Sequence, residues 1–157
     1  MTKGCPTQLR WLAVTLVVAI WAISLALPAL AVEGAGVLTG WDVLKVGWQG
    51  IGVKLLAWYA NPLFAVGVVA FAGRLFGFAG VVSGFGLVLA LTSFAAREIA
   101  AGSGFPLPTL TLKVGFFVWL ASLCILLVIS WRCWALAAVE KTQSNGMRGI
   151  DHHGGGP

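Results

Sequence analysis

The chain has 157 residues, of which 59% are hydrophobic and only 10% are charged, whereas soluble domains carry roughly 25% charged residues. A water-soluble fold of this size cannot bury so much apolar surface, so the composition excludes a soluble protein and predicts one that lies in a lipid bilayer. The net charge of +5 does not indicate nucleic-acid binding, because the basic residues stand singly between apolar segments.

The apolar segments are continuous and do not alternate with polar residues, which favours membrane-spanning helices over a β-barrel. We predict an all-α integral membrane bundle of four transmembrane helices with an interfacial amphipathic segment. The predicted spans are residues 11–32, 55–72, 75–95 and 116–134, and the amphipathic segment is 36–54. They form a single transmembrane domain at 1–139, followed by a flexible, glycine-rich cytoplasmic tail at 140–157.

The first predicted span, 11–32, contains no charged residue and is long enough to cross a bilayer as a helix. It also has features of a cleavable signal peptide, since Lys3 and Arg10 precede the apolar run and the motif Ala-Leu-Ala at 29–31 matches a signal-peptidase site. The apolar run is longer than a usual signal-peptide core. We therefore predict a retained span, with cleavage after this motif as the alternative.

The segment 36–54 has an amphipathic pattern. Trp41 and Trp48 recur with aliphatic residues at three- and four-residue spacing, whereas Asp42 and Lys45 fall elsewhere on the helical wheel. This pattern predicts a helix in the membrane interface with its tryptophans as anchors. The alternative is an outward extension of the second span, because several glycines weaken a helix here.

The second span contains Asn61-Pro62, where the helix either begins or kinks, since asparagine is a favoured cap and proline suits the first helical position. Trp58 is predicted to anchor the interface at that end. The apolar stretch that follows is too long for one helix and is interrupted by Gly73-Arg74. We therefore predict a tight turn between the second and third spans.

Four glycines recur at intervals of four, three and four residues along the third span: Gly73, Gly77, Gly80 and Gly84. They share one helix face and leave a groove where another helix backbone can approach closely, so we interpret them as a helix-packing site. A partner within the chain is favoured. A symmetry mate and another subunit are the alternatives.

The last span ends with Trp131 and Trp134 on either side of Arg132, as expected of an aromatic belt with a snorkelling cation. The segment 96–114 before it mixes charges, glycines and prolines and is predicted to be an extramembrane loop. With the N-terminus inside, six basic residues lie on the cytoplasmic side and four lie outside. We therefore predict a multi-pass protein of the cell membrane, the inner membrane in a bacterium, with both termini cytoplasmic.

Neither a catalytic site, a metal site nor a cofactor is expected. All five acidic residues fall outside the predicted spans, so an embedded carboxylate for proton-coupled transport is missing. The cysteines, Cys5, Cys124 and Cys133, lack zinc-ligand or redox spacing, and His152-His153 lie in the tail.

The predicted function is that of a non-enzymatic accessory or scaffold subunit, which works by helix association with a membrane-protein partner or a second copy within the lipid bilayer. The alternative is an oligomeric channel or carrier for a small solute, with Asn61, Ser83 and Arg74 along its path. Arg74 and Arg132 also have two interpretations, as contacts for an anion or lipid head group and, preferably, as positive-inside anchors. An enzyme is the least favoured class, because candidate acid–base groups do not converge.

Overall fold

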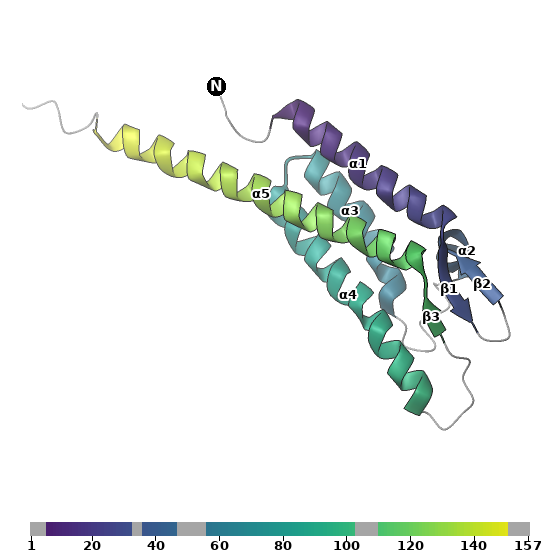
Figure 1. Ribbon diagram of the computed structural model, residues 1–157. Helices are drawn as coiled ribbons and strands as arrows, with labels where there is room; N and C mark the ends of the chain where they lie inside the picture. The colour runs from purple at the N-terminus through teal and green to yellow at the C-terminus, as the bar shows by residue number, and fades with distance from the viewer. Residues whose placement is uncertain (1–5, 33–35, 47–55, 103–109, 151–157) are drawn as a thin grey trace, which may run out of the picture.

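The computed structural model describes residues 6–32, 36–46, 56–102 and 110–150 and is mostly helical (Figure 1). Its helices in chain order are α1 (Thr7–Ala26), α2 (Gly40–Val46), the 3-10 helix η2 (Leu56–Tyr59), α3 (Ala60–Ala72), α4 (Phe76–Gly102) and α5 (Val114–Ile150). The predicted predominance of helix is confirmed.

Helices α1, α4 and α5 are long and apolar enough to cross a membrane, whereas η2 and α3 form a shorter apolar stretch, Leu56–Ala72. In the apolar windows of the three long helices only 22%, 28% and 33% of the residues are buried within the chain. So many apolar side chains left on the outside would be unfavourable in water, and they are compatible with contact to lipid acyl chains. Three such helices are compatible with a multi-pass membrane protein, while the length of α3 alone does not establish a fourth crossing.

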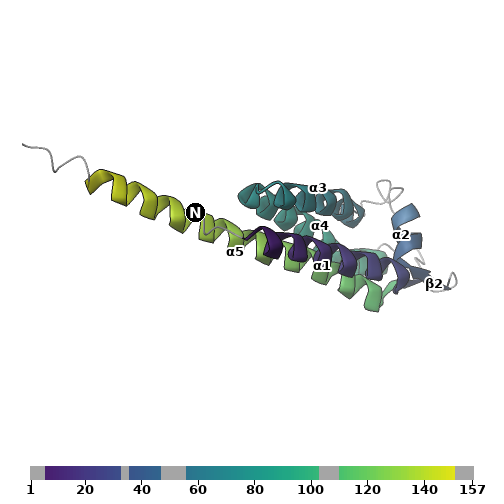
Figure 2. The same ribbon diagram turned by 90° about the horizontal axis from the view of Figure 1, so that it is seen from above.

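The helices pack in two layers. Figure 2 shows α3 and α4 above α1 and α5, and α4 packs along both α3 and α5, while α1 packs along α5. The core between the layers combines small residues with a few large ones: Ala13, Val17, Ala60, Phe64, Ala70, Phe71, Ala79, Ala90, Leu123, Leu126 and Cys133. The many alanines let the helix backbones approach closely, which is how helices gain packing energy in lipid.

A small antiparallel sheet closes one end of the bundle. Its central strand β1 (Pro28–Val32) lies between β2 (Gly36–Thr39) and β3 (Leu110–Leu112). Strand β1 directly follows α1, and β3 directly precedes α5. The β1–β3 pairing therefore holds the ends of α1 and α5 side by side at what we call the sheet end of the bundle.

The structure corrects the predicted boundaries at the sheet end. The first helix ends at Ala26 and not at residue 32, because Pro28 cannot donate a helical hydrogen bond and the chain turns into β1. The amphipathic segment is a strand over Gly36–Thr39 and a helix over Gly40–Val46, and residues 47–54 lie outside the described part of the chain. The sheet itself was not predicted.

The last two helices are longer than predicted. Helix α4 continues to Gly102, so the predicted loop at 96–114 is helical at its start and contains β3 near its end. Helix α5 continues to Ile150, well into the predicted tail, whose final residues 151–157 lie outside the described part. Figure 1 shows α5 projecting past the other helices at the end opposite the sheet.

Candidate functional site

Asn61 joins three helices at the sheet end. It lies in the first turn of α3, and its Oδ1 accepts hydrogen bonds from the indole Nε1 of Trp21 on α1, at 3.3 Å, and of Trp119 on α5, at 3.0 Å. Its Nδ2 donates to the main-chain oxygen of Trp58 at 3.2 Å. Because an amide oxygen has two lone pairs, the two indoles use its full accepting capacity.

The hydrogen bonds extend from Asn61 to α2. The indole Nε1 of Trp58 donates to the main-chain oxygen of Leu44 at 2.9 Å, which lies in the last turn of α2, where helical carbonyls lack partners within the helix. We call Trp21, Trp58, Asn61 and Trp119 the tryptophan–asparagine network. It connects α1, α2, η2, α3 and α5 and thereby sets their relative positions.

Neighbouring side chains hold the two donor tryptophans in place. The ring of Trp21 stacks on Phe64 with centroids 5.8 Å apart and planes 17° apart. Buried Ser24 and Ser122 donate to the main-chain oxygens of Trp21 and Trp119, at 2.6 and 2.7 Å. The network has neither a titratable group nor a free acceptor at the Asn61 oxygen, so its chemistry is that of positioning helices.

The three residues predicted to line a polar path do not come together. Asn61 lies at the sheet end, Ser83 lies within α4 with 0% of its surface exposed, and Arg74 is exposed in the turn after α3, at the other end of that helix. Ser83 faces Gly67 of α3 so closely that a Cβ added to Gly67 would lie 2.9 Å from the Ser83 Oγ. In this structure Ser83 is therefore part of a packed contact.

Arg74 occupies the left-handed position of the turn between α3 and α4. Its φ is 66°, and two hydrogen bonds close the turn, from Arg74 N to Phe71 O at 3.1 Å and from Leu75 N to Ala70 O at 2.9 Å. This pattern is a Schellman motif, in which glycine is the usual left-handed residue. Here the glycine, Gly73, stands one residue too early and has a φ of −78°.

The glycine row on α4 faces α5 of the same chain. A Cβ added to Gly77 would lie 3.1 Å from the Trp134 ring, whereas one on Gly80 or Gly84 would meet Ser130 or Leu127 at 3.8 and 3.9 Å. Gly73 lies outside this row, at the C-terminal cap of α3. The groove beside these glycines is thus filled by α5. Among the three glycines of the row, only Gly77 is in a tight contact.

The closest contacts between a glycine and a neighbouring element lie at glycines outside the predicted helix-packing site. A Cβ on Gly67 would lie 3.2 Å from Leu126, one on Gly115 would lie 2.8 Å from the Pro28 main-chain oxygen, and one on Gly40 would lie 2.8 Å from the Leu25 Cα. None of them belongs to the glycine row at 73–84, so the spacing of that row did not mark them. The contact at Gly40 packs the start of α2 against the last turn of α1, and the contact at Gly115 packs the start of α5 against the start of β1.

The predicted interfacial anchors lie at both ends of the bundle. Trp41 on α2 is exposed, and the Lys45 Nζ lies 5.3 Å above its ring. At the other end Trp131 and Trp134 are exposed with centroids 5.2 Å apart, and Arg132 between them is exposed as well. Trp58 is instead partly buried in the network, and Trp48 lies outside the described residues.

Asp42 caps α2. Its Oδ2 accepts from the Thr39 Oγ1 at 2.6 Å and the Thr39 main-chain N at 3.1 Å, and the Thr39 Oγ1 accepts from Asp42 N at 3.3 Å. This is a capping box with aspartate in place of the usual glutamate. The hydrogen bonds from Thr39, the side-chain one above all, lower the pKa of Asp42, because they favour the charged carboxylate.

Within the described residues, no group of three or more histidine, cysteine, aspartate or glutamate side chains comes together as a metal site. Cys5 and His152-His153 lie outside the described part, while Cys124 is partly buried and Cys133 is buried on α5. No protein-family model, curated protein or solved structure matches the chain. Function must therefore be inferred from the chain's own geometry.

Proposed function

We propose that the chain is a non-enzymatic, four-pass membrane protein that serves as an accessory or scaffold subunit of a larger membrane assembly. The observation that carries the proposal is the saturation of Asn61 by indoles from two other helices. A conduit or an enzyme would keep such an interior polar group available to a solute. Here its hydrogen bonds fix the positions of helices, which is the property that a rigid platform needs.

The proposed topology has four crossings with both termini in the cytoplasm. The Gly73-Arg74 turn lies at the end of the bundle opposite the sheet, so α3 and α4 form a hairpin beside α1 and α5. With η2 and α3 as a short second crossing, the sheet and α2 lie on the outer side. The exposed Arg74 and Arg132 then lie on the inner side, in agreement with the positive-inside rule.

A partner must contact the outward side chains of the helices. The groove at Gly77, Gly80 and Gly84 is filled by α5 and is not open to another subunit. Phe85 on α4, 65% exposed, is an outward position, whereas Leu123 on α5, 0% exposed, is an interior one. These two positions offer a matched pair for detecting lateral contacts.

The test is site-specific photo-cross-linking in the native membrane, combined with native mass spectrometry of the tagged protein in mild detergent. A photoreactive phenylalanine analogue at Phe85 is expected to capture a defined membrane protein or a second copy, and the same analogue at Leu123 to capture none. A stoichiometric complex of matching mass would support the subunit role. A lone monomer with equal, diffuse cross-linking from both positions would overturn it.

An oligomeric channel or carrier is the second candidate, and one observation favours it. The Oγ atoms of Ser83 and Ser130 are buried and have no hydrogen-bond partner among the described residues. Groups that line a conduit would find water there. A Ser83→Cys variant labelled from the aqueous phase would therefore favour a conduit, whereas complete protection would favour the packed contact.

A further inference from the structure

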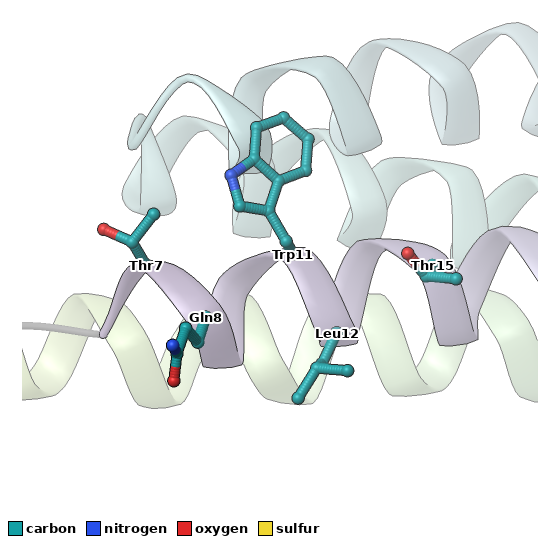
Figure 3. A pocket seen from close by; sticks show the side chains of 5 residues that line it. All are labelled: Thr7, Gln8, Trp11, Leu12 and Thr15. Atoms are coloured by element: carbon teal, nitrogen blue, oxygen red, sulfur yellow. The ribbon is translucent and has the colours of Figure 1, made fainter.

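Two buried hydroxyls in the interior of the bundle, those of Ser83 and Ser130, have no hydrogen-bond partner among the described residues. A buried polar group without a partner is unfavourable, so its surroundings indicate where a ligand is needed. A surface hollow along the first turns of α1 offers no such group, because the side chains that line it are all exposed (Figure 3): Thr7, Gln8, Trp11, Leu12 and Thr15.

The Ser130 side chain faces the glycine row of α4. Its Cβ lies 3.8 Å from the place that a Cβ on Gly80 would occupy, and 0% of its surface is exposed. Ser83 points instead at α3, where a Cβ added to Gly67 would lie only 2.9 Å from the Ser83 Oγ. Ser130 is therefore the unpartnered hydroxyl that points into the contact between α4 and α5.

The contact between α4 and α5 is loose beside Ser130. A methyl group at Gly80 or Gly84 would meet its nearest neighbour at 3.8 or 3.9 Å, which is ordinary van der Waals contact. Each position therefore has space for one more methyl-sized group, which is also about the size of a water molecule. The main-chain oxygens of the row have two lone pairs each, so with the Ser130 hydroxyl they supply the partners that a buried water needs.

The Trp134 ring covers the end of this contact that lies away from the sheet. A Cβ added to Gly77 would lie 3.1 Å from that ring, so the ring rests on the α4 backbone. Trp134 is 46% exposed, and exposed side chains change rotamer within nanoseconds. Ser130 lies one helical turn closer to the sheet, roughly 6 Å along α5. Rotation of a single indole thus connects Ser130 with the membrane interface.

We propose that the contact between α4 and α5 binds water beside Ser130 and that the Trp134 ring is the gate of this site. Water enters from the end opposite the sheet when the ring turns away from Gly77. It is held between the Ser130 hydroxyl and the main-chain oxygens of the glycine row, and the returning ring separates it from the acyl chains. The site does not depend on the proposed subunit role, because a water site one turn deep is compatible with a subunit and with a conduit alike.

The test compares Ser130→Cys with Ser122→Cys in full-length protein that lacks Cys5, Cys124 and Cys133 and is reconstituted in lipid nanodiscs. Ser122 is the matched control, because it lies on the same helix, is also 0% exposed and donates within that helix. Silver nitrate is the probe, and the thiol that survives it is measured by maleimide labelling in SDS and intact mass. Ser130→Cys should react at least about tenfold faster, because modification of a buried thiol follows the population of its open form.

Two further substitutions test the gate. Trp134→Ala, combined with Ser130→Cys, removes the ring and should speed the reaction with silver, whereas Gly80→Ala fills the space beside the thiol and should slow it. The rate of Ser122→Cys should respond to neither. Equal rates for Ser130→Cys and Ser122→Cys would overturn the water site. An unchanged rate with Trp134→Ala would overturn the gate.

A second measurement covers the case in which the cysteine variants fail to fold. If the Ser130 hydroxyl binds water, Ser130→Ala loses that hydrogen bond, and its midpoint of unfolding in SDS should fall below that of wild type. In a dry contact the unpartnered hydroxyl is itself unfavourable, so a raised midpoint would overturn the water site. Ser122→Ala loses a hydrogen bond in either case and shows that the titration detects such a loss.

Discussion

Two indole N–H groups depend on the single carboxamide of Asn61. An Asn61→Leu substitution removes their common acceptor and leaves both part-buried donors without this partner. We predict a loss of about 1–3 kcal/mol in the free energy of unfolding, which is the usual penalty for unpaired buried polar groups. The measurement is an SDS titration in mixed micelles, followed by far-ultraviolet circular dichroism.

Thr92→Val provides the control for Asn61→Leu. The Thr92 hydroxyl donates only to the main-chain oxygen of Leu89 within α4, at 2.6 Å, so its loss should leave the contacts between helices intact. We expect an unfolding midpoint close to that of wild type. If Asn61→Leu unfolds at the same point as Thr92→Val, the network does not hold the helices together.

Arg74 is predicted to be a site of stored backbone strain. A non-glycine residue in the left-handed region costs about 1–2 kcal/mol, and Arg74 has a φ of 66°. Arg74→Gly should therefore raise the free energy of unfolding by about 1 kcal/mol. Gly73→Ala is the control and should be nearly neutral, since its Cβ would meet the Val69 and Ala70 carbonyls at 3.4 and 3.5 Å.

The SDS titration of Arg74→Gly can also give the opposite result. A lower free energy of unfolding for Arg74→Gly would mean that the arginine side chain stabilises the fold by more than the backbone strain destabilises it.

Residue spacing predicted a turn at Gly73-Arg74. It did not identify Arg74 as the strained residue, because glycine is the ordinary left-handed residue and stands next to it.

Residue patterns likewise explain why the network was missed. From its place before Pro62, Asn61 is predicted to be a helix cap or kink, and Trp58 alone among the tryptophans of the network is predicted to be an interfacial anchor. The two donors are 40 and 58 residues away from Asn61. Their convergence depends on how α1, α3 and α5 pack, which no local spacing records. The glycine row, by contrast, is a local pattern and was visible in the sequence.

Among the elements, α2 has a predictable pH response. The pKa of Asp42 is lowered below its ordinary value of 3.8, first because the Thr39 hydroxyl donates to the carboxylate. A lowered pKa in the folded state means that the stabilisation is fully present above pH 3.8 and is lost as the pH falls through the lower, folded value. We predict that the start of α2 frays below that range.

Hydrogen exchange of residues 36–46, corrected for the intrinsic rate at each pH, measures this fraying. Wild type should lose protection as the pH falls below about 4. Asp42→Asn does not titrate and should show the same protection at every pH. A pH-independent wild type would contradict the role of the capping carboxylate.

Strand β1 bears on the fate of the N-terminus. The small-x-small motif at 29–31 lies within the central strand, where Ala31 pairs with Val37 on one side and Thr111 on the other. Cleavage after Ala31 would remove most of β1 and, with α1, the bond from Trp21 to Asn61. We predict that residues 1–31 are retained, and the intact mass of protein purified from membranes checks this.

An Ala31→Leu variant is the control for retention, because a bulky residue at this position blocks signal peptidase. Its mass should differ from wild type only by the substitution. An N-terminus at Val32 in wild type but not in Ala31→Leu would contradict the prediction and establish a cleaved leader.

Helices and strands differed in how far the sequence predicted them. Helices α4 and α5 begin close to the predicted spans, because each contains an apolar run of the length that a membrane-spanning helix requires. Strand β1 continues the apolar run of α1 without a polar break, and a run of that length is typical of strand and buried helix alike. Its partner β3 lies in a segment whose prolines and glycines predicted a loop.

For the whole molecule, the open physical question is whether the α3–α4 hairpin crosses the bilayer. Helix η2 has 4 residues and α3 has 13, which together reach roughly 25–28 Å, just short of the ~30 Å of hydrocarbon. Arg74 at the tip can extend its side chain to the interface, and the bilayer can thin locally at a modest cost. We therefore predict a full crossing.

Cysteine accessibility distinguishes a crossing from a re-entrant hairpin. In a background without Cys5, Cys124 and Cys133, single cysteines are placed at Arg74 in the hairpin turn and at Thr111 in β3, both exposed in the structure. With a membrane-impermeant maleimide, Thr111→Cys should react in intact cells and Arg74→Cys only after permeabilisation. Protection of Arg74→Cys from both sides would place the turn within the hydrocarbon. The hairpin would then be re-entrant and the chain would cross with α1 and α5 alone, because α4 returns to the side from which α3 entered.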